Sequence, residues 1–266
     1  MTDRLNRSLA PISEEAWRLI DAEAKRSLAH FLAARSVVDF TGPLGWDFSA
    51  QPTGRTDPSI WPVEGVRVRT RRVVALSEVR VPFTLVRDEI DAVEKGSTSP
   101  DLDAVTIAAR RAAEVEDGAI FSGLAGTEGM SPASPQDPVR LTESYAEYPR
   151  HVATAVARLR RAGVEGPYAI ALGDRCYTGV IETTEHGGYP VLEHLRAILG
   201  GRVVWAPALD GAIVVSIRGG DFEIFSGGDF AVGFTAATHT TVELYLEESF
   251  AFVIHEAKAA VKLSYD

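Results

Sequence analysis

An alternating stretch within residues 66–85 restricts the fold of this chain more than any other part of the sequence. Where it begins, apolar or hydroxyl side chains alternate with arginines: Val66, Arg67, Val68, Arg69, Thr70 and Arg71. This two-residue period predicts β-structure, and we expect the stretch to form a hairpin with one basic face. Such a ribbon has too little apolar surface to pack on its own domain, so a neighbouring subunit is its expected partner. An ordinary solvated hairpin is the alternative.

Amphipathic patterns predict three helices. The first begins after Ser13, an N-cap residue followed by two glutamates, and its apolar positions recur at helical spacing: Trp17, Ile20, Ala24, Leu28, Phe31 and Leu32. The second runs from Asp101 to about Gly123 with one apolar face: Leu102, Val105, Ala109, Ala112, Val115, Ala119 and Ile120. The third runs from about Pro149 to Gly163.

Short β-rich runs fill the second half of the chain. They cover residues 168–172, 203–206, 212–216, 222–225 and 230–234, and residues 242–263 are expected to form a further strand pair. Helices and strands together predict an α+β fold. The Gly- and Pro-containing stretch at 123–142 is interpreted as a surface crossing between two lobes of one subunit.

Composition argues against several classes of function. A formal net charge of -10 opposes binding to nucleic acid and to anionic membranes. The N-terminus has no apolar h-region and no run of about eighteen apolar residues occurs, so we expect neither a signal peptide nor a transmembrane helix. Cys176 is the single cysteine, which precludes an intrachain disulfide and fits a reducing cytoplasm. We expect a cytoplasmic protein without nucleic-acid or membrane partners.

Candidate catalytic groups are few. Cys176 and His186 would form a thiol–imidazole pair if a turn brought them together, as in a Cys-dependent hydrolase. The sequence from Asp174 to Tyr177 instead looks like the first turn of a short helix, which favours a structural, half-buried cysteine. The carboxylate pairs are interpreted as solvated or ion-paired faces: Glu114 with Glu116, and Glu247 with Glu248. We therefore expect a protein that is not an enzyme, with the hydrolase as the less favoured alternative.

Metal and phosphate motifs are also not evident. The histidines do not share the i, i+4 or HExxH spacing that places two ligands on one helical face: His30, His151, His186, His194, His239 and His255. Gly123, Gly126 and Gly129 follow a helix rather than a strand, so they predict a turn and not a phosphate-binding loop. We expect no metal site.

Segments spread over nearly the whole chain resemble one family in the same order. They are LAPISEEAWRLIDAEA, ARSVVDFTGPLGW, VRVPFTLVRDEIDAVEKGS, AEVEDGAIFSG, AGVEGPYAIAL, ETTEHGGYPVLEHL, VVWAPALDGAIVVSIRGGDFEIFSGGDFAVGF and VELYLEESFAF. This series resembles the family 1 encapsulin shell proteins of the linocin type. The resemblance implies the capsid fold of Hong-Kong-97-type tailed phages, and a homo-oligomeric icosahedral shell of T=1 symmetry with about sixty copies.

The resemblance also assigns residues to the parts of that fold. Residues 1–40 would form an N-terminal lumenal helix and arm, 41–65 and 86–142 the peripheral domain with its spine helix, 66–85 the extended loop, 143–220 most of the axial domain, and 221–266 a return to the peripheral domain. Contacts between subunits through the extended loop would use its arginines: Arg67, Arg69, Arg71 and Arg80.

A cargo enzyme is the partner that the resemblance implies. Such cargo, a dye-decolorising peroxidase or a ferritin-like protein, carries a C-terminal targeting peptide that inserts into an apolar groove on the lumenal wall. The matching positions here are Leu28, Leu32, Arg35, Asp39, Asp229 and Phe230. Plain core packing or helix termination is the alternative for each. A phage or prophage major capsid protein is the alternative for the whole chain, and the N-terminal helix argues against it because phage coat proteins of this fold usually lack one.

A glycine-containing loop matches the rim of the five-fold pore in this family. It consists of Thr184, Glu185, His186, Gly187, Gly188 and Tyr189. Five copies of Glu185 and His186 around an axis would form a charge filter whose sign depends on pH. An ordinary surface turn is the alternative.

Some members of the family bind a flavin on the outer surface. Arg80 matches one contact position, but Asp88 stands where the stacking tryptophan would be. We therefore expect no flavin and no other cofactor.

Overall fold

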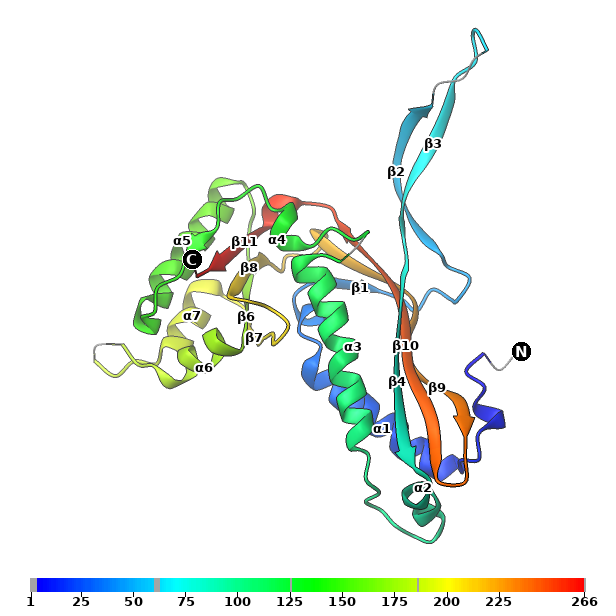
Figure 1. Cartoon of the computed structure of the whole chain (residues 1–266). Coiled ribbons are helices and arrows are strands. Elements are labelled where there is room, and N and C mark those ends of the chain that lie inside the picture. The colour runs from blue at the N-terminus through cyan, green and yellow to red at the C-terminus, as the bar shows by residue number, and fades with distance from the viewer. Residues whose placement is uncertain (1–3, 60–62, 125, 186, 266) are drawn as a thin grey trace.

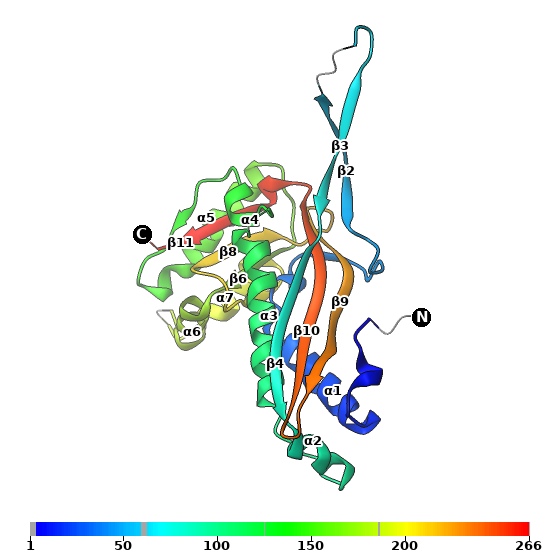
Figure 2. The same cartoon turned by 45° about the vertical axis from the view of Figure 1, so that its right-hand side comes forward.

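The computed structural model describes residues 4–59, 63–124, 126–185 and 187–265. Within these ranges the chain forms two lobes, each built on its own sheet, and a two-stranded ribbon projects away from both (Figures 1 and 2). The mixture of helices and strands confirms the α+β prediction.

The three predicted helices are present. α1 (Glu14–Phe31) begins after Ser13, whose Oγ accepts a hydrogen bond from the amide of Ala16 at 3.3 Å. α3 (Asp103–Ser122) and α5 (Tyr148–Arg161) confirm the other two. The predicted apolar face of α3 is wrong at Val115, which is 37% exposed, because the buried face includes Glu116 instead.

A four-stranded sheet in the order β1-β9-β10-β4 forms the first lobe. Its strands are β1 (Asp39–Thr41), β4 (Ser77–Val86), β9 (Phe222–Ala237) and β10 (Thr241–Ile254). α1 and α3 pack on each other and on this sheet, and the short α2 (Arg87–Glu94) lies at its end (Figure 1). Their apolar side chains share one core with Phe83, Val232 and Leu246. The runs predicted at 222–225 and 230–234 are both part of β9.

A five-stranded sheet in the order β5-β11-β8-β6-β7 forms the second lobe. Its strands are β5 (Val139–Arg140), β6 (Tyr168–Leu172), β7 (Val203–Trp205), β8 (Ala212–Ser216) and β11 (Ala260–Ser264), and its helices are α5, α6 (Asp174–Glu182) and α7 (Val191–Leu199). β6 and β8 are buried along their whole length, as central strands covered on both faces are. The strands predicted at 168–172, 203–206 and 212–216 are thereby confirmed.

Three segments of the described ranges connect the lobes, and one of them, residues 217–221, runs from β8 to β9. Residues 123–142 run from α3 to α5, as predicted, and contain α4 (Met130–Ala133). The prediction that this segment lies on the surface is wrong at Met130 and Val139, because both side chains are buried. The strand pair predicted at 242–263 is also wrong. β10 belongs to the first sheet and β11 to the second, with a short 3-10 helix, η4 (Ala257–Ala259), between them. The remaining 3-10 helices of the described ranges are η1 (Arg7–Leu9), η2 (Ala34–Ser36) and η3 (Tyr145–Glu147).

The projecting ribbon pairs β2 (Ala50–Ser59) with β3 (Val68–Ala75) in antiparallel register. The hairpin predicted at 66–85 is therefore wrong, because β4 follows β3 directly and pairs with β10. An alternating pattern of side chains predicts that a segment is a strand, but it does not predict which other strand pairs with it. β2 itself contains Pro52, Gly54 and Pro58, which strands usually avoid and which a ribbon edge tolerates.

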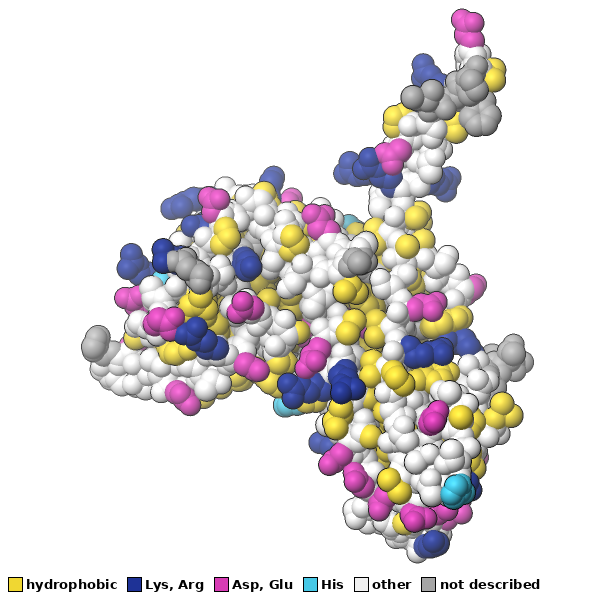
Figure 3. Space-filling view, in the orientation of Figure 1, with side chains coloured by type: hydrophobic (Ala, Val, Ile, Leu, Met, Phe, Trp, Pro, Cys, Tyr) yellow, Lys and Arg dark blue, Asp and Glu magenta, His cyan; other side chains and the backbone are white. Residues whose placement is uncertain are grey.

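The ribbon is basic and solvent-exposed within one subunit. Arg69 and Arg71 on β3 are exposed, as is Arg67 in the turn that precedes it, and basic side chains project from the ribbon in Figure 3. Arg80 does not belong to the ribbon as predicted. It lies on β4, where its Nη2 binds the Glu247 carboxylate at 2.6 Å and its guanidinium lies 4.1 Å from the centre of the Tyr245 ring.

Across the described ranges, no helix combines the length and the apolar character that crossing a bilayer would require.

Candidate functional site

A groove of about 640 Å³ lies between α1, η2 and β9. Its lining includes five of the six predicted peptide-contact residues: Leu28, Leu32, Arg35, Asp229 and Phe230. The sixth, Asp39, does not line it. The Asp39 carboxylate accepts a hydrogen bond from the amide of Gly220 at 2.5 Å, beside a separate, mostly polar hollow. The structure therefore brings together residues from two distant parts of the sequence and excludes one of those predicted.

The groove combines an apolar floor with charges of both signs. Leu28, Leu32, Phe230, Val232 and Leu246 supply the apolar surface, together with Ala24, Ala29 and Ala231. Arg7, Asp21 and Lys25 add charge at the α1 side, and Arg7 binds Asp21 at 2.7 Å. The sequence does not single out this group, because charged residues at half-buried or exposed positions of a helix and its preceding segment are common. An extended peptide with apolar side chains and a few charges would suit such a surface.

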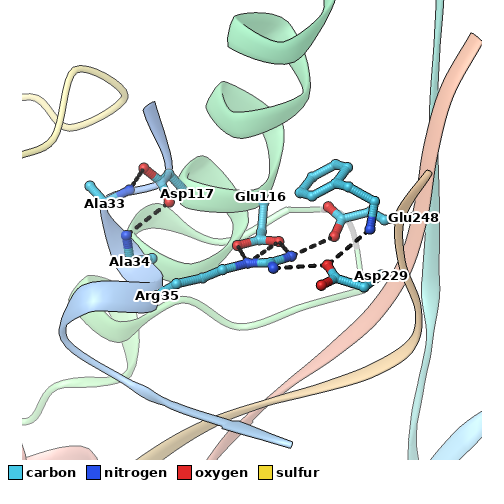
Figure 4. A network of polar contacts seen from close by, with 8 residues as sticks. Ala33, Ala34, Arg35, Glu116, Asp117, Asp229 and Glu248 are labelled. Carbon is cyan, nitrogen blue, oxygen red and sulfur yellow. Dashed lines mark hydrogen bonds and ion pairs between the residues drawn. The ribbon is translucent and has the colours of Figure 1, made fainter. Parts of the chain in front are cut away.

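Arg35 lies where the groove meets the protein interior, and three carboxylates surround its guanidinium (Figure 4). Its Nη2 contacts Glu116 Oε2 at 2.6 Å and Glu248 Oε2 at 3.1 Å, and its Nη1 contacts Asp229 Oδ1 at 2.8 Å. Burial alone would lower the pKa of Arg35, but Glu116 above all, with Asp229 and Glu248, raises it. Arg35 therefore stays positively charged, and its ion pairs link the segment that follows α1 to α3, β9 and β10.

An irregularity in the sheet places Asp229 in this network. In the pairing of β9 with β10, Glu247 lies opposite Ala231 and Ser249 opposite Gly228. Two residues of β9, Asp229 and Phe230, therefore face the single residue Glu248, which is the arrangement of a β-bulge. The bulge directs Asp229 toward Arg35 and leaves Phe230 in the groove lining.

Asp117, the neighbour of Glu116 on α3, binds the backbone at the exit of α1. Its two carboxylate oxygens accept hydrogen bonds from the amides of Ala33 and Ala34, each at 2.9 Å (Figure 4). Burial raises the pKa of Asp117 to about 7, against the two backbone hydrogen bonds, and the neighbouring Glu116 adds to the rise. The segment that leaves α1 is thus held by a side chain that titrates near neutral pH.

The carboxylate pairs predicted to be solvated or ion-paired are all ion-paired, but three of the four glutamates are not solvated. Glu116, Glu247 and Glu248 are buried, and each takes part in an ion pair, whereas Glu114 is exposed and pairs with Arg110 at 2.9 Å. Glu247 and Glu248 point to opposite faces of the sheet, as neighbours on a strand do. The sequence carries one signal for these buried glutamates: acidic residues interrupt the apolar face of α3.

A second hollow, of about 830 Å³, adjoins the groove and shares Ala29, Leu32 and Ser36 with it. Its other walls come from the second lobe and include Tyr177, Arg196, Arg202 and Trp205. His30 lines it as well, with its ring centre 5.1 Å from that of Trp205. The sequence does not predict this hollow, because it forms only where residues of the two lobes come together.

The predicted pore loop is a tight turn between α6 and α7. Thr184 and Pro190 form an isolated β-bridge, and the amide of Glu185 donates to the Tyr189 carbonyl at 2.8 Å. Gly187 and Gly188 have φ values of 107° and 82°, which suit glycine. His186 lies outside the described residues. The partner of Glu185 within them is a residue not predicted, His194, whose Nδ1 lies 2.9 Å from Glu185 Oε1.

Cys176 is a buried residue of α6. Its side chain is 1% exposed, and the Tyr148 hydroxyl donates a hydrogen bond to its sulfur at 3.1 Å. The prediction of a structural cysteine is confirmed, with deeper burial than expected, because a thiol nucleophile must be accessible to its substrate. A search of the described side chains found no cluster of His, Cys, Asp or Glu suited to a metal ion.

Comparison with known sequences shows the family. The Linocin_M18 family model, described as an encapsulating protein for peroxidase, matches residues 1–251. The chain is 45% identical to the type 1 encapsulin shell protein of Rhodospirillum rubrum, over 97% of this chain and 95% of that protein. It is 43% identical to the type 1 encapsulin shell protein of Mycobacterium tuberculosis, over 99% of this chain and 100% of that protein.

Known structures share the fold at low sequence identity. The virus-like particle from Pyrococcus furiosus matches with a TM-score of 0.66 and 14% identity, over 93% of this chain and 98% of that one. A structure of Mycobacterium phage Bobi matches with a TM-score of 0.54 and 15% identity, over 98% of this chain and 94% of that one. The expected Hong-Kong-97-type capsid fold is confirmed. With this fold and with shell proteins as relatives along nearly its whole length, the chain belongs to the encapsulin shell-protein family.

Proposed function

We propose that copies of this chain close into a shell around a cargo enzyme, and that the groove between α1 and β9 holds the enzyme's C-terminal targeting peptide. The observation that carries the proposal is the convergence of Leu28, Leu32 and Arg35 with Asp229 and Phe230 on one groove. These residues come from two distant parts of the sequence, and the family resemblance assigns them to one binding surface.

The chemistry of the groove sets the kind of peptide. Its apolar floor, with Leu28, Leu32 and Phe230, would take aliphatic side chains of an extended segment. Arg35 and Asp229 bind each other at 2.8 Å and form the polar edge of the groove. Binding at one groove would be modest, and many grooves on one inner wall would raise the overall affinity for a multi-subunit cargo.

The shell part of the proposal depends on the ribbon. β2 and β3 have both faces exposed in a single subunit, and a two-stranded ribbon of this kind is at most marginally stable by itself. A neighbouring copy that contacts Arg69 and Arg71 would stabilise it. We propose a T=1 icosahedron of about sixty copies, with the first lobe as the peripheral domain, the second lobe as the axial domain, and residues 184–189 at the five-fold pore.

The description of the matching family supports one class of cargo. The matching family model is described as an encapsulating protein for peroxidase, which favours a dye-decolorising peroxidase over a ferritin-like protein. We propose that the loaded shell is cytoplasmic. A phage coat role is the second candidate, since phage capsids share the fold, but the shell-protein relatives are 45% and 43% identical to this chain, against 15% for the phage structure.

Native mass spectrometry of purified particles tests the shell, because it reports copy number and passenger together. A chain that stays monomeric at high concentration would overturn this part of the proposal.

The groove is tested separately. The C-terminal tail of the passenger is fused to a fluorescent protein and co-expressed with the shell carrying Leu32→Asp, with Leu124→Asp as the matched control at an exposed site outside the groove. We expect empty particles of normal size for Leu32→Asp and loaded particles for Leu124→Asp. Equal loading of both would refute the groove assignment and leave the shell intact.

A further inference from the structure

Glu116 and Glu248 meet in the interior behind the groove, where neither side chain is exposed to solvent. Both contact the same nitrogen of Arg35, and Asp229 takes the other terminal nitrogen. Three carboxyl groups therefore face one guanidinium. One oxygen, Glu248 Oε1, has no hydrogen-bond partner among the described residues although it is buried.

Two fully buried negative charges, with Asp229 at the exposed edge, would be costly against the one positive charge of Arg35. Removing a carboxylate from water costs several kcal/mol unless an ion pair or hydrogen bonds compensate. Arg35 compensates Glu116 best, through both Nε and Nη2, and reaches Glu248 through a single longer contact. A proton on Glu248 would remove one charge and create a donor beside the Glu116 carboxylate.

We propose that Glu248 is protonated in the folded protein and that its O–H group donates a hydrogen bond to the Glu116 carboxylate. This proton-dependent contact, called the lock below, joins β10 to α3 and, through Arg35, to the segment that follows α1. The lock holds Arg35, which lines the groove together with Ser36, and through it the segment from Ala33 to Ser36. Since the lock is internal to one subunit, the inference does not depend on what the groove binds.

The electrostatic surroundings support this assignment. Burial, followed by the charge and the hydrogen bond of Glu116, raises the pKa of Glu248 well above its ordinary range. Arg35 opposes the rise and Asp229 adds to it. The charged groups facing Glu248 are Arg35 from η2, Glu116 from α3 and Asp229 from β9, and Asp117 of α3 in turn interacts with Glu116 and Arg35. Glu247 lies on the other face, bound to Arg4 and Arg80.

The sign of the pH effect follows from this arrangement. The unfolded chain loses the Glu248 proton near the ordinary value of 4.5, whereas the folded chain keeps it to higher pH. The contribution of the lock is complete below that ordinary value and is lost as the pH rises to the raised pKa. Above it, two buried carboxylates repel each other under the groove wall, and the segment from Ala33 to Ser36 loosens.

Infrared spectroscopy of assembled particles tests the proton directly. Particles with isotope-labelled glutamate should show the carbonyl band of a protonated glutamic acid at about pH 7, where exposed glutamates are ionised. Glu248→Gln should remove this band, and Glu114→Gln, on the exposed side of the same helix as Glu116, should leave it. Absence of the band from the wild-type particle would overturn the proposal, even if no variant assembled.

Hydrogen exchange tests the lock. The amides of Ala33 and Ala34, which donate to Asp117, report on the held segment. As the pH rises through the raised pKa of Glu248, their protection factors should fall by about tenfold or more in the wild type and in Glu114→Gln. They should fall less in Glu248→Gln, which cannot ionise. Parallel losses in Glu248→Gln and the wild type would refute the lock.

Discussion

Arg35 and Glu116 are 81 residues apart in the sequence and meet through both Nε and Nη2 of the guanidinium, at 2.9 Å and 2.6 Å. Arg35 follows α1 and is 20% exposed, whereas the Glu116 side chain is fully buried in α3. The pair ties the exit of the N-terminal helix to the long helix of the first lobe. Because Arg35 also lines the groove, the shape of that surface depends on this contact.

Arg35→Ala should destabilise the protein strongly. It leaves Glu116 and Glu248 buried without their cation, and removing one partner of a buried ion pair costs about 3–5 kcal/mol. Urea unfolding followed by tryptophan fluorescence measures the loss. Arg110→Ala, which breaks the exposed pair with Glu114, should cost no more than about 1 kcal/mol. Similar losses for the two variants would contradict the central role of Arg35.

Asp117→Asn should flatten part of the pH dependence of stability. The folded chain holds the Asp117 proton up to about pH 7, while the unfolded chain loses it near 3.8, so the free energy of unfolding falls as the pH rises between these values. Asparagine does not titrate, so the difference between variant and wild type should change with pH in this window. Thermal unfolding over a pH series measures it, with the exposed Asp210→Asn as a control that keeps the wild-type slope.

Arg69→Glu combined with Arg71→Glu should prevent assembly without unfolding the subunit. Both side chains are exposed on the ribbon, so the change removes nothing from either core, but it reverses the charge that a neighbouring copy would meet. Size-exclusion chromatography should show small species with the circular dichroism of the wild type. The control Arg161→Glu, at an exposed position of α5, should assemble normally. Normal particles from the ribbon variant would argue against its role between subunits.

Cys176 should resist thiol reagents in the folded protein. Its side chain is 1% exposed and accepts a hydrogen bond from Tyr148, so a disulfide-based reagent can reach the sulfur only after unfolding. Absorbance of the released thiol measures labelling before and after addition of denaturant. Rapid labelling of native particles would show that the thiol is accessible and would revive the hydrolase alternative.

Two glycines should respond to alanine in opposite ways. A Cβ at Gly233 would lie 2.2 Å from the Tyr245 ring, so Gly233→Ala should cost about 1–3 kcal/mol through overpacking. A Cβ at Gly118 in α3 would meet no atom within 4 Å, so Gly118→Ala should stabilise the helix by about 0.5–1 kcal/mol. Unfolding midpoints of the two variants measure both effects, and a neutral Gly233→Ala would contradict the close approach of Tyr245.

The elements that could be predicted from the sequence are those whose signals are local. Ser13 and the glutamates after it mark the start of α1, and the apolar runs at 168–172 and 212–216 mark β6 and β8, because capping and hydrophobic period act over a few residues. The family resemblance added the set of groove residues, of which Asp39 alone lies elsewhere.

Which strands pair with each other could be seen only in the folded structure. Whether β3 joins β2 or β4, and whether β10 and β11 share a sheet, depends on contacts between distant segments that a local pattern does not encode. The same holds for the burial of Glu116 and Glu248. A glutamate becomes tolerable inside a protein only when a partner such as Arg35 arrives from elsewhere in the fold, so its position along one helix or strand cannot reveal it.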